Sequence, residues 1–290
     1  MHPNNPYSAR YDLERLAKQH PALQKHFVLN PAGAQTIDFS DSDAVYNLNK
    51  AMLLSDFGLT QYELPKGYLI PPIPGRLEYL LLLQEFMAQQ FDVATESVLK
   101  GLDIGSGANG IYCILGAQHF NWNMTGAECD PKAVAIANTN LDHTKGLQNK
   151  IDFRHQENKS NLFKGIIQPG EFFDFTVCNP PFYSSKEEAT KASYKKRRNL
   201  TQTSHPKDEL NFQGQAGELW CNGGEALFIK RLIKESLLFK SQVKVFSSLV
   251  ARSENLSKIK KQLTKANANF EILNMDLGNK KSRIVCWWFE

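Results

Sequence analysis

The sequence predicts an α/β fold, in which a mostly parallel sheet carries helices on both faces. From about residue 91 onward, short apolar runs alternate with helical patterns, and this alternation is typical of parallel sheets. The last two apolar runs are joined only by the short, glycine-containing stretch 278–281, which favours an antiparallel hairpin at one edge. We therefore expect seven strands, of which the last two form a hairpin.

The elements can be located one after another along the chain. The expected strands cover residues 97–104, 123–128, 150–154, 172–178, 243–250, 269–275 and 283–289. The expected helices cover residues 77–90, 110–120, 131–145, 223–240 and 253–267. The stretch 183–221 fits neither pattern and is far longer than an ordinary connection, so we expect a functional or disordered insertion there.

The N-terminal region differs in character from the rest. It holds eight of the 13 prolines and two short helical patterns, at 11–17 and 42–50. The run 71–76 reads as a stiff turn that leads into the helix beginning at Leu77. Such a region is too poor in strands to form a large core of its own. We expect residues 1–90 to be a cap on a sheet domain at 91–290.

Composition excludes several classes of protein. The 290 residues are 42% hydrophobic and 22% charged, with 34 Lys and Arg against 30 Asp and Glu, a net charge of +4. Five cysteines without C-x-x-C spacing argue against a disulfide framework or a structural zinc site, and the seven histidines show no metal-ligand spacing. No apolar stretch approaches the roughly 18 residues of a membrane span, and the N-terminus lacks a secretory signal. We expect a cytoplasmic globular protein.

A glycine loop follows the first strand of the sheet domain. Gly105, Gly107 and Gly110 have G-x-G-x-x-G spacing between an apolar strand and a helical run, which is typical of a cofactor loop at a helix N-terminus. Asp103 would repel a pyrophosphate but suits a ligand with an ammonium group and a positive sulfur, such as S-adenosylmethionine. Glu128 ends the next strand, where a carboxylate can accept ribose hydroxyls. This favours S-adenosylmethionine over a nicotinamide cofactor; a tight turn without a ligand is the purely structural alternative.

A second motif, Asn179-Pro180-Pro181-Phe182, ends the fourth strand. Ligands of open α/β sheets bind beyond the carboxyl ends of the strands, so this turn faces the same crevice as the glycine loop. The Asn179 side-chain oxygen and the Pro180 carbonyl can accept the hydrogens of a planar amine, and Phe182 can stack on a base. Positioning and desolvation would then carry a methyl transfer to that amine. The alternative is a β-turn with an exposed phenylalanine.

These motifs resemble the class I amino-methyltransferases, which have a Rossmann-like fold. The fuller match is to the bacterial 23S ribosomal RNA (adenine(1618)-N(6))-methyltransferase family, and more distantly to the eukaryotic enzymes that act on U6 small nuclear RNA. The resemblance spans nearly the whole chain. Its motifs are those at 2–5, 8–13, 37–39, 71–76, 126–128, 179–182 and 223–225.

Roles for single residues are implied by this resemblance. The implied cofactor-binding residues are Arg76, at the methionine carboxylate, Asp103, Gly105, Gly107, Glu128, at the ribose, and Gln156, at the adenine end. The implied catalytic residues, which hold the target adenine, are Asn179, Pro180, Pro181 and Phe182. Arg76 in a surface salt bridge is the alternative for that residue.

The insertion adds a basic cluster close to the catalytic turn, formed by Lys195, Lys196, Arg197 and Arg198. We expect it to contact RNA phosphates without reading sequence, the alternative being a solvated loop. The resulting hypothesis is a methyltransferase that uses S-adenosylmethionine, without a metal, on the N6 amine of adenine 1618 in 23S ribosomal RNA or a large-subunit assembly intermediate. Methylation of a protein glutamine amide, a non-catalytic RNA-binding factor and a nicotinamide oxidoreductase remain as alternatives.

Overall fold

The computed structural model describes residues 1–9, 11–185, 187–188, 220–277 and 280–290. Its α-helices are α1 (Leu13–Gln19), α2 (Ser42–Asp56), α3 (Ile73–Phe91), α4 (Ile111–His119), α5 (Pro131–Asp142), α8 (Gly224–Ser236) and α9 (Leu256–Lys265). Its strands are β1 (Phe27–Leu29), β2 (Gln35–Ile37), β3 (Lys100–Ile104), β4 (Asn123–Glu128), β5 (Ile151–His155), β6 (Phe173–Cys178), β7 (Val243–Val250), β8 (Asn269–Leu277) and β9 (Lys280–Trp288). Within these ranges, no helix has the length and apolar character needed to span a membrane.

Among the described residues, seven strands form one sheet in the order β5-β4-β3-β6-β7-β9-β8. The pairs β5–β4, β4–β3, β3–β6 and β6–β7 are parallel. Strand β9 runs antiparallel to both of its neighbours, β7 and β8. The prediction of a mostly parallel, seven-stranded sheet with a C-terminal hairpin at one edge is therefore confirmed.

The register of the central strands explains where the motifs meet. Ile104 of β3 lies beside Ala127 of β4 on one side and Cys178 of β6 on the other. Parallel strands end at the same edge of a sheet, so the residues that follow this row emerge side by side. Those residues are Gly105, Glu128 and Asn179.

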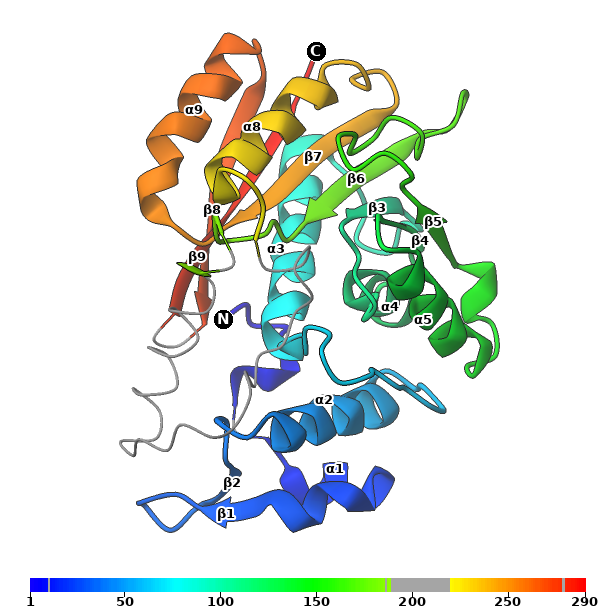
Figure 1. The fold of residues 1–290 in the computed structure, drawn as a ribbon, viewed down its shortest axis with the longest axis vertical. Coiled ribbons are helices and arrows are strands. Elements are labelled where there is room, and N and C mark those ends of the chain that lie inside the picture. Colours follow the sequence, from blue (N-terminus) through cyan, green and yellow to red (C-terminus); the bar gives the residue numbers. More distant parts are fainter. Residues whose placement is uncertain (10, 186, 189–219, 278–279) are drawn as a thin grey trace.

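The sheet separates two apolar cores, because successive side chains of a strand point to opposite faces. In β7, Val245 and Leu249 belong to the first core, whereas Phe246 and Val250 belong to the second. Helices α1 to α5 contribute buried residues to the first core, and α8 and α9 contribute to the second. Figure 1 shows α3 and α8 on opposite sides of the sheet.

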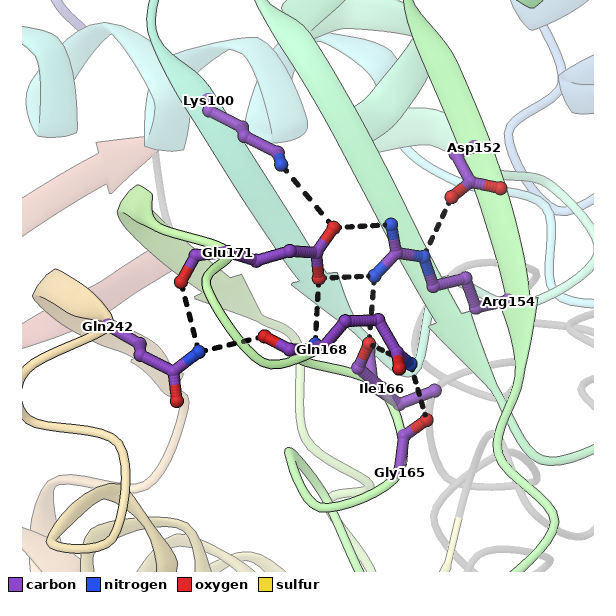
Figure 2. Close-up of polar contacts among 8 residues, drawn as sticks. All are labelled: Lys100, Asp152, Arg154, Gly165, Ile166, Gln168, Glu171 and Gln242. Carbon is purple, nitrogen blue, oxygen red and sulfur yellow. Dashed lines mark hydrogen bonds and ion pairs between the residues drawn. The ribbon is translucent and has the colours of Figure 1, made fainter.

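The segment 156–171 covers part of the second face in place of a helix, and a polar network holds it (Figure 2). Arg154 of β5 donates from Nη1 and Nη2 to the carboxylate of Glu171 at 2.7 and 2.8 Å, and from Nη1 to the carbonyl of Ile166 at 2.8 Å. The backbone N–H of Gln168 donates to Glu171 at 2.8 Å. The segment therefore has defined side-chain anchors although it contains no long regular element.

The N-terminal residues are bound to α3. The Glu78 carboxylate is buried and accepts hydrogen bonds from the backbone N–H of His2 at 2.6 Å and from the side chain of Asn5 at 2.8 Å. Asn5 also donates to the carbonyl of Pro74 at 3.1 Å. These contacts give a structural reason for the His2–Asn5 motif.

Two details of the N-terminal region correct the sequence-based expectations. Helix α3 begins at Ile73 rather than Leu77, so residues 73–76 form its first turn instead of a stiff turn before it. Pro74 is tolerated there because the first residues of a helix need no N–H donor. The sequence pattern predicts neither β1 nor β2. Each has only three residues, which is too short for an alternation of apolar and polar residues to be recognised.

Candidate active site

A cavity opens at the carboxyl ends of β3, β4 and β6 and encloses about 900 Å³, its open mouth included. It lies where the strand order reverses, because the chain adds β4 and β5 on one side of β3 and β6 and β7 on the other. Such a switch point is the usual ligand position in open α/β sheets. The cavity is lined by these sequence-predicted residues: Arg76, Asp103, Gly105, Gly107, Glu128, Gln156, Asn179 and Pro181.

The glycine loop bends back towards β4. The backbone N–H groups of Gly105 and Ser106 donate to the carbonyl of Ala127 at 2.9 and 3.0 Å. Gly105 and Gly107 adopt φ values of +76° and +62°, which strongly favour glycine. Gly110 has a φ of +54°, and a Cβ there would lie 2.5 Å from the ring of Phe153. The glycine spacing therefore meets conformational needs as well as leaving backbone close to the cavity.

Asp103 is a buried carboxylate without a partner. The residue is 1% exposed, and neither of its carboxylate oxygens has a hydrogen-bond partner. Burial raises the pKa of Asp103 from 3.8 to about 8, Arg76 opposes this shift, and Glu128 adds to it. An ionised carboxylate in such a place needs a cation, so the site fits a ligand that carries an ammonium group.

Arg76 reaches the same cavity from the first turn of α3. Its Nη1 donates to the hydroxyl of Tyr112 at 2.9 Å, and its guanidinium carbon lies 5.3 Å from the centre of the Tyr112 ring. The residue is buried, and its Nε has no hydrogen-bond partner. Arg76 is therefore an internal cation of the cavity and not a surface salt bridge. Sequence reasoning did not identify Tyr112, which reads as an apolar position of α4.

Glu128 links the segments that follow β3 and β4. Its carboxylate accepts hydrogen bonds from the backbone N–H of Gly107 at 3.0 Å, Cys129 at 2.7 Å and Asp130 at 2.9 Å. A carboxylate offers about four acceptor positions, and Glu128 is only partly buried. These bonds orient the carboxylate while it lines the cavity.

Gln156 belongs to the wall formed by the segment 156–171. Its side chain donates to the carbonyl of Lys164 at 2.9 Å and accepts from the backbone N–H of Asn158 at 3.1 Å. Both polar atoms of the side chain thus brace the segment. Sequence reasoning missed the other residues of this part of the wall, which have no motif spacing: Lys159, Asn161, Leu162 and, from α8, Phe228.

The turn after β6 presents one unpaired acceptor. The side-chain oxygen of Asn179 is buried and has no hydrogen-bond partner. Pro180 and Pro181 are buried, and Pro181 lines the cavity with Asn179. Phe182 is half-buried and packs against the first core. The structure thus brings Asn179 and Asp103 to one cavity.

The beginning of the insertion is fixed by hydrogen bonds and an ion pair. Glu188 accepts from the backbone and side chain of Ser184 at 2.8 and 2.6 Å and from Arg252 at 2.6 Å. The basic cluster Lys195–Arg198 lies outside the described residues. Across the part of the chain that is described, no group of three or more His, Cys, Asp or Glu side chains could hold a metal ion.

Relatives of known name match the whole chain. It is 47% identical over 290 residues to a protein of Christiangramia forsetii named ribosomal RNA large subunit methyltransferase F, with all of both chains covered. A protein of the same name from Pseudomonas fluorescens is 42% identical, covering 100% of this chain and 86% of the relative. A third, from Desulfotalea psychrophila, is 40% identical, covering 100% and 94%.

Solved structures with a similar fold include complexes with an RNA hairpin and with SAH. The hMettl16 catalytic domain in complex with MAT2A 3′UTR hairpin 1 has a TM-score of 0.83 at 27% identity, covering 100% of this chain and 96% of that one. The N-terminal domain of human METTL16 in complex with SAH has a TM-score of 0.77 at 26% identity, covering 100% and 99%. These matches confirm the resemblance and the fold inferred from the motifs. Residues 1–290 match the family described as RNA methyltransferase, and the chain belongs to that family.

Proposed function

We propose that this chain transfers a methyl group from S-adenosylmethionine to the exocyclic N6 amine of adenine 1618 in 23S ribosomal RNA. The observation that carries the proposal is the presence of two buried, unpaired acceptors, the Asp103 carboxylate and the Asn179 side-chain oxygen, in one cavity. One suits an ammonium group of a cofactor and the other suits an amine of a substrate. The names of the relatives support ribosomal RNA as the substrate.

The cavity residues fit the polar groups of S-adenosylmethionine. Asp103 would pair with the ammonium group, Arg76 with the carboxylate through its free Nε edge, and Glu128 with the ribose hydroxyls. Gln156 and its neighbours would flank the adenine end. When bound, this cofactor supplies a methyl group on a positively charged sulfur, which makes the methyl carbon electrophilic.

The protein's part in the transfer is to hold the acceptor amine. The Asn179 oxygen and the Pro180 carbonyl would each accept a hydrogen bond from one N–H of the amine. These two bonds would orient the nitrogen lone pair towards the cofactor side of the cavity. Burial of the Asn179 oxygen strengthens such a bond because water does not compete for it. The target adenine must be unpaired or flipped out of its stack to reach this turn. Phe182 is the proposed stacking partner of the base.

Outside the cavity, we propose that RNA phosphates contact the basic cluster Lys195–Arg198 and the cap formed by residues 1–90. The substrate is 23S ribosomal RNA or a large-subunit assembly intermediate, and the site of action is the cytoplasm. In this proposal the sheet domain, residues 91–290, is the methyltransferase domain, and α3 of the cap contributes Arg76 to its cofactor site. No metal is required, since the reacting sulfur already carries the positive charge.

The test is methyl transfer from labelled S-adenosylmethionine to 23S ribosomal RNA, with mass spectrometry of the digested nucleosides. We expect N6-methyladenosine from wild-type protein, none from Asn179→Ala, and none when adenine 1618 is replaced by guanine. Asn138→Ala is the matched control, because Asn138 is exposed on α5 and bonds only within its own helix, to the carbonyl of Val134. Label on a protein glutamine, with RNA unmodified, would overturn the substrate assignment.

A further inference from the structure

In the cavity, Arg76 contacts a neutral side chain, that of Tyr112. Its Nη1 donates to the hydroxyl of Tyr112, and its guanidinium group lies over the Tyr112 ring. Burial raises the pKa of Tyr112 to about 12, so its hydroxyl keeps its proton at neutral pH. The contact is thus a hydrogen bond and ring packing, and it leaves the charge of Arg76 uncompensated by Tyr112.

Tyr112 is itself held from behind. Its ring meets the ring of Tyr79 edge-on, with centres 5.3 Å apart and an interplanar angle of 83°. The Tyr79 hydroxyl is 2.9 Å from the hydroxyl of Ser247, which donates to the carbonyl of Thr176 in β6. Tyr79, Tyr112 and Ser247 are buried. A chain of buried contacts therefore leads from the sheet to the guanidinium group.

The free edge of Arg76 is the part that a carboxylate would use. Its Nε lacks a hydrogen-bond partner, and bidentate binding of a carboxylate requires two N–H groups of the planar guanidinium in a set direction. The Tyr112 hydroxyl occupies Nη1 and so restricts rotation of that plane. Without the hydroxyl, the buried guanidinium would lose the contact that fixes its orientation.

We propose that Tyr112 is a positioning residue for cofactor binding, which acts through Arg76 on the carboxylate of the methionine moiety. The inference rests on the cofactor assignment of the proposed function and deepens it. It does not depend on which base or RNA is methylated. Tyr112 therefore governs recognition of the amino-acid end of the cofactor and leaves recognition of the adenosine end unaffected.

The experiment measures binding of two probes by calorimetry, with competition where binding is weak. S-adenosylhomocysteine carries the amino-acid end, whereas 5′-methylthioadenosine lacks it. Tyr112→Phe keeps the ring and removes the hydroxyl. We expect it to weaken S-adenosylhomocysteine binding by about tenfold or more, the scale of one hydrogen bond to a charged group, and to leave 5′-methylthioadenosine binding unchanged. Tyr7→Phe is the matched control, since it likewise keeps the ring and removes the hydroxyl of a buried tyrosine, but one that donates to Asp56 and not to Arg76, and neither affinity should change.

A second variant shows whether Tyr112 acts through Arg76. Arg76→Lys keeps a positive charge but loses the planar group, and adding Tyr112→Phe to it should cause no further loss of S-adenosylhomocysteine affinity. Additive losses, or equal losses for both probes in Tyr112→Phe, would overturn the inference. So would unchanged S-adenosylhomocysteine binding in Tyr112→Phe when the wild-type protein binds it. A wild-type protein that binds no S-adenosylhomocysteine would instead overturn the cofactor assignment itself.

Discussion

Replacing Asp103 by asparagine should stabilise the fold and abolish cofactor binding. Burial raises the pKa of Asp103 from 3.8 to about 8, so near pH 7 folding must take up a proton that the unfolded chain does not hold. For an acid whose pKa is raised by folding, the contribution of the protonated group to the free energy of unfolding is complete below its ordinary pKa. That contribution is lost as the pH rises through the pKa of the folded state. Asparagine has nearly the same shape and needs no proton.

The size of the effect follows from the two pKa values. Each pH unit between them costs about 1.4 kcal/mol of folding free energy. Between pH 5 and pH 8, the stability gained by Asp103→Asn should therefore grow by about 3–4 kcal/mol and then level off. Urea denaturation of both proteins at a series of pH values measures this difference.

Asp103→Asn should have the opposite effect on ligand binding, which it should abolish. S-adenosylhomocysteine should raise the melting temperature of the wild-type protein by mass action and leave that of Asp103→Asn unchanged, because the ammonium group loses its ionic partner. Asp142→Asn is the control, since Asp142 is exposed at the end of α5 and keeps its hydration on folding. A stability difference for Asp103→Asn that stays constant from pH 5 to pH 8 would refute the reasoning, because Asp103 would then be ionised in the folded protein.

Three further variants test the surroundings of the site. Arg154 holds the pKa of Glu171 down from 4.5 to about 2 (Figure 2), so this contact stabilises the fold above the ordinary pKa and is lost as pH falls towards 2. Glu171→Gln should lower the urea-unfolding free energy by about 1–2 kcal/mol at pH 7, with a smaller loss at pH 3; an equal loss at both would contradict the ionic account. The Glu235 carboxylate accepts hydrogen bonds from the backbone N–H groups of residues 162–164 at 2.8–3.0 Å. Glu235→Gln should therefore weaken S-adenosylhomocysteine binding in calorimetry. Unchanged affinity would show that the cavity wall formed by the segment 156–171 does not need the Glu235 contacts. Alanine at all four positions of 195–198 should reduce the slope of RNA affinity against salt by about 3 while S-adenosylhomocysteine binding stays constant; an unchanged slope would remove the cluster from the RNA contacts.

Local patterns in the sequence were sufficient for the sheet and for the turns that end its central strands. Strand and helix periodicities differ, and the residues around Gly105 and Asn179 have turn chemistry that depends on close neighbours only. Because β3, β4 and β6 are parallel, their ends had to meet at one edge. The short strands β1 and β2 and the start of α3 at Ile73 carry weaker local signals, and there the sequence-based expectation was incomplete or wrong.

The sequence by itself therefore determined the α/β class. It also determined that Asp103, Glu128 and Asn179 gather at the edge of the sheet where the parallel strands have their carboxyl ends. Only the tertiary structure decided the contacts that orient them. Arg76 and Tyr112 are 36 positions apart, and Glu235 anchors a segment more than 70 positions away. Such contacts depend on how α3, α4 and α8 pack on the two faces of the sheet. No periodicity or turn motif encodes them, because each is set by the side-chain shapes of elements that are distant along the chain.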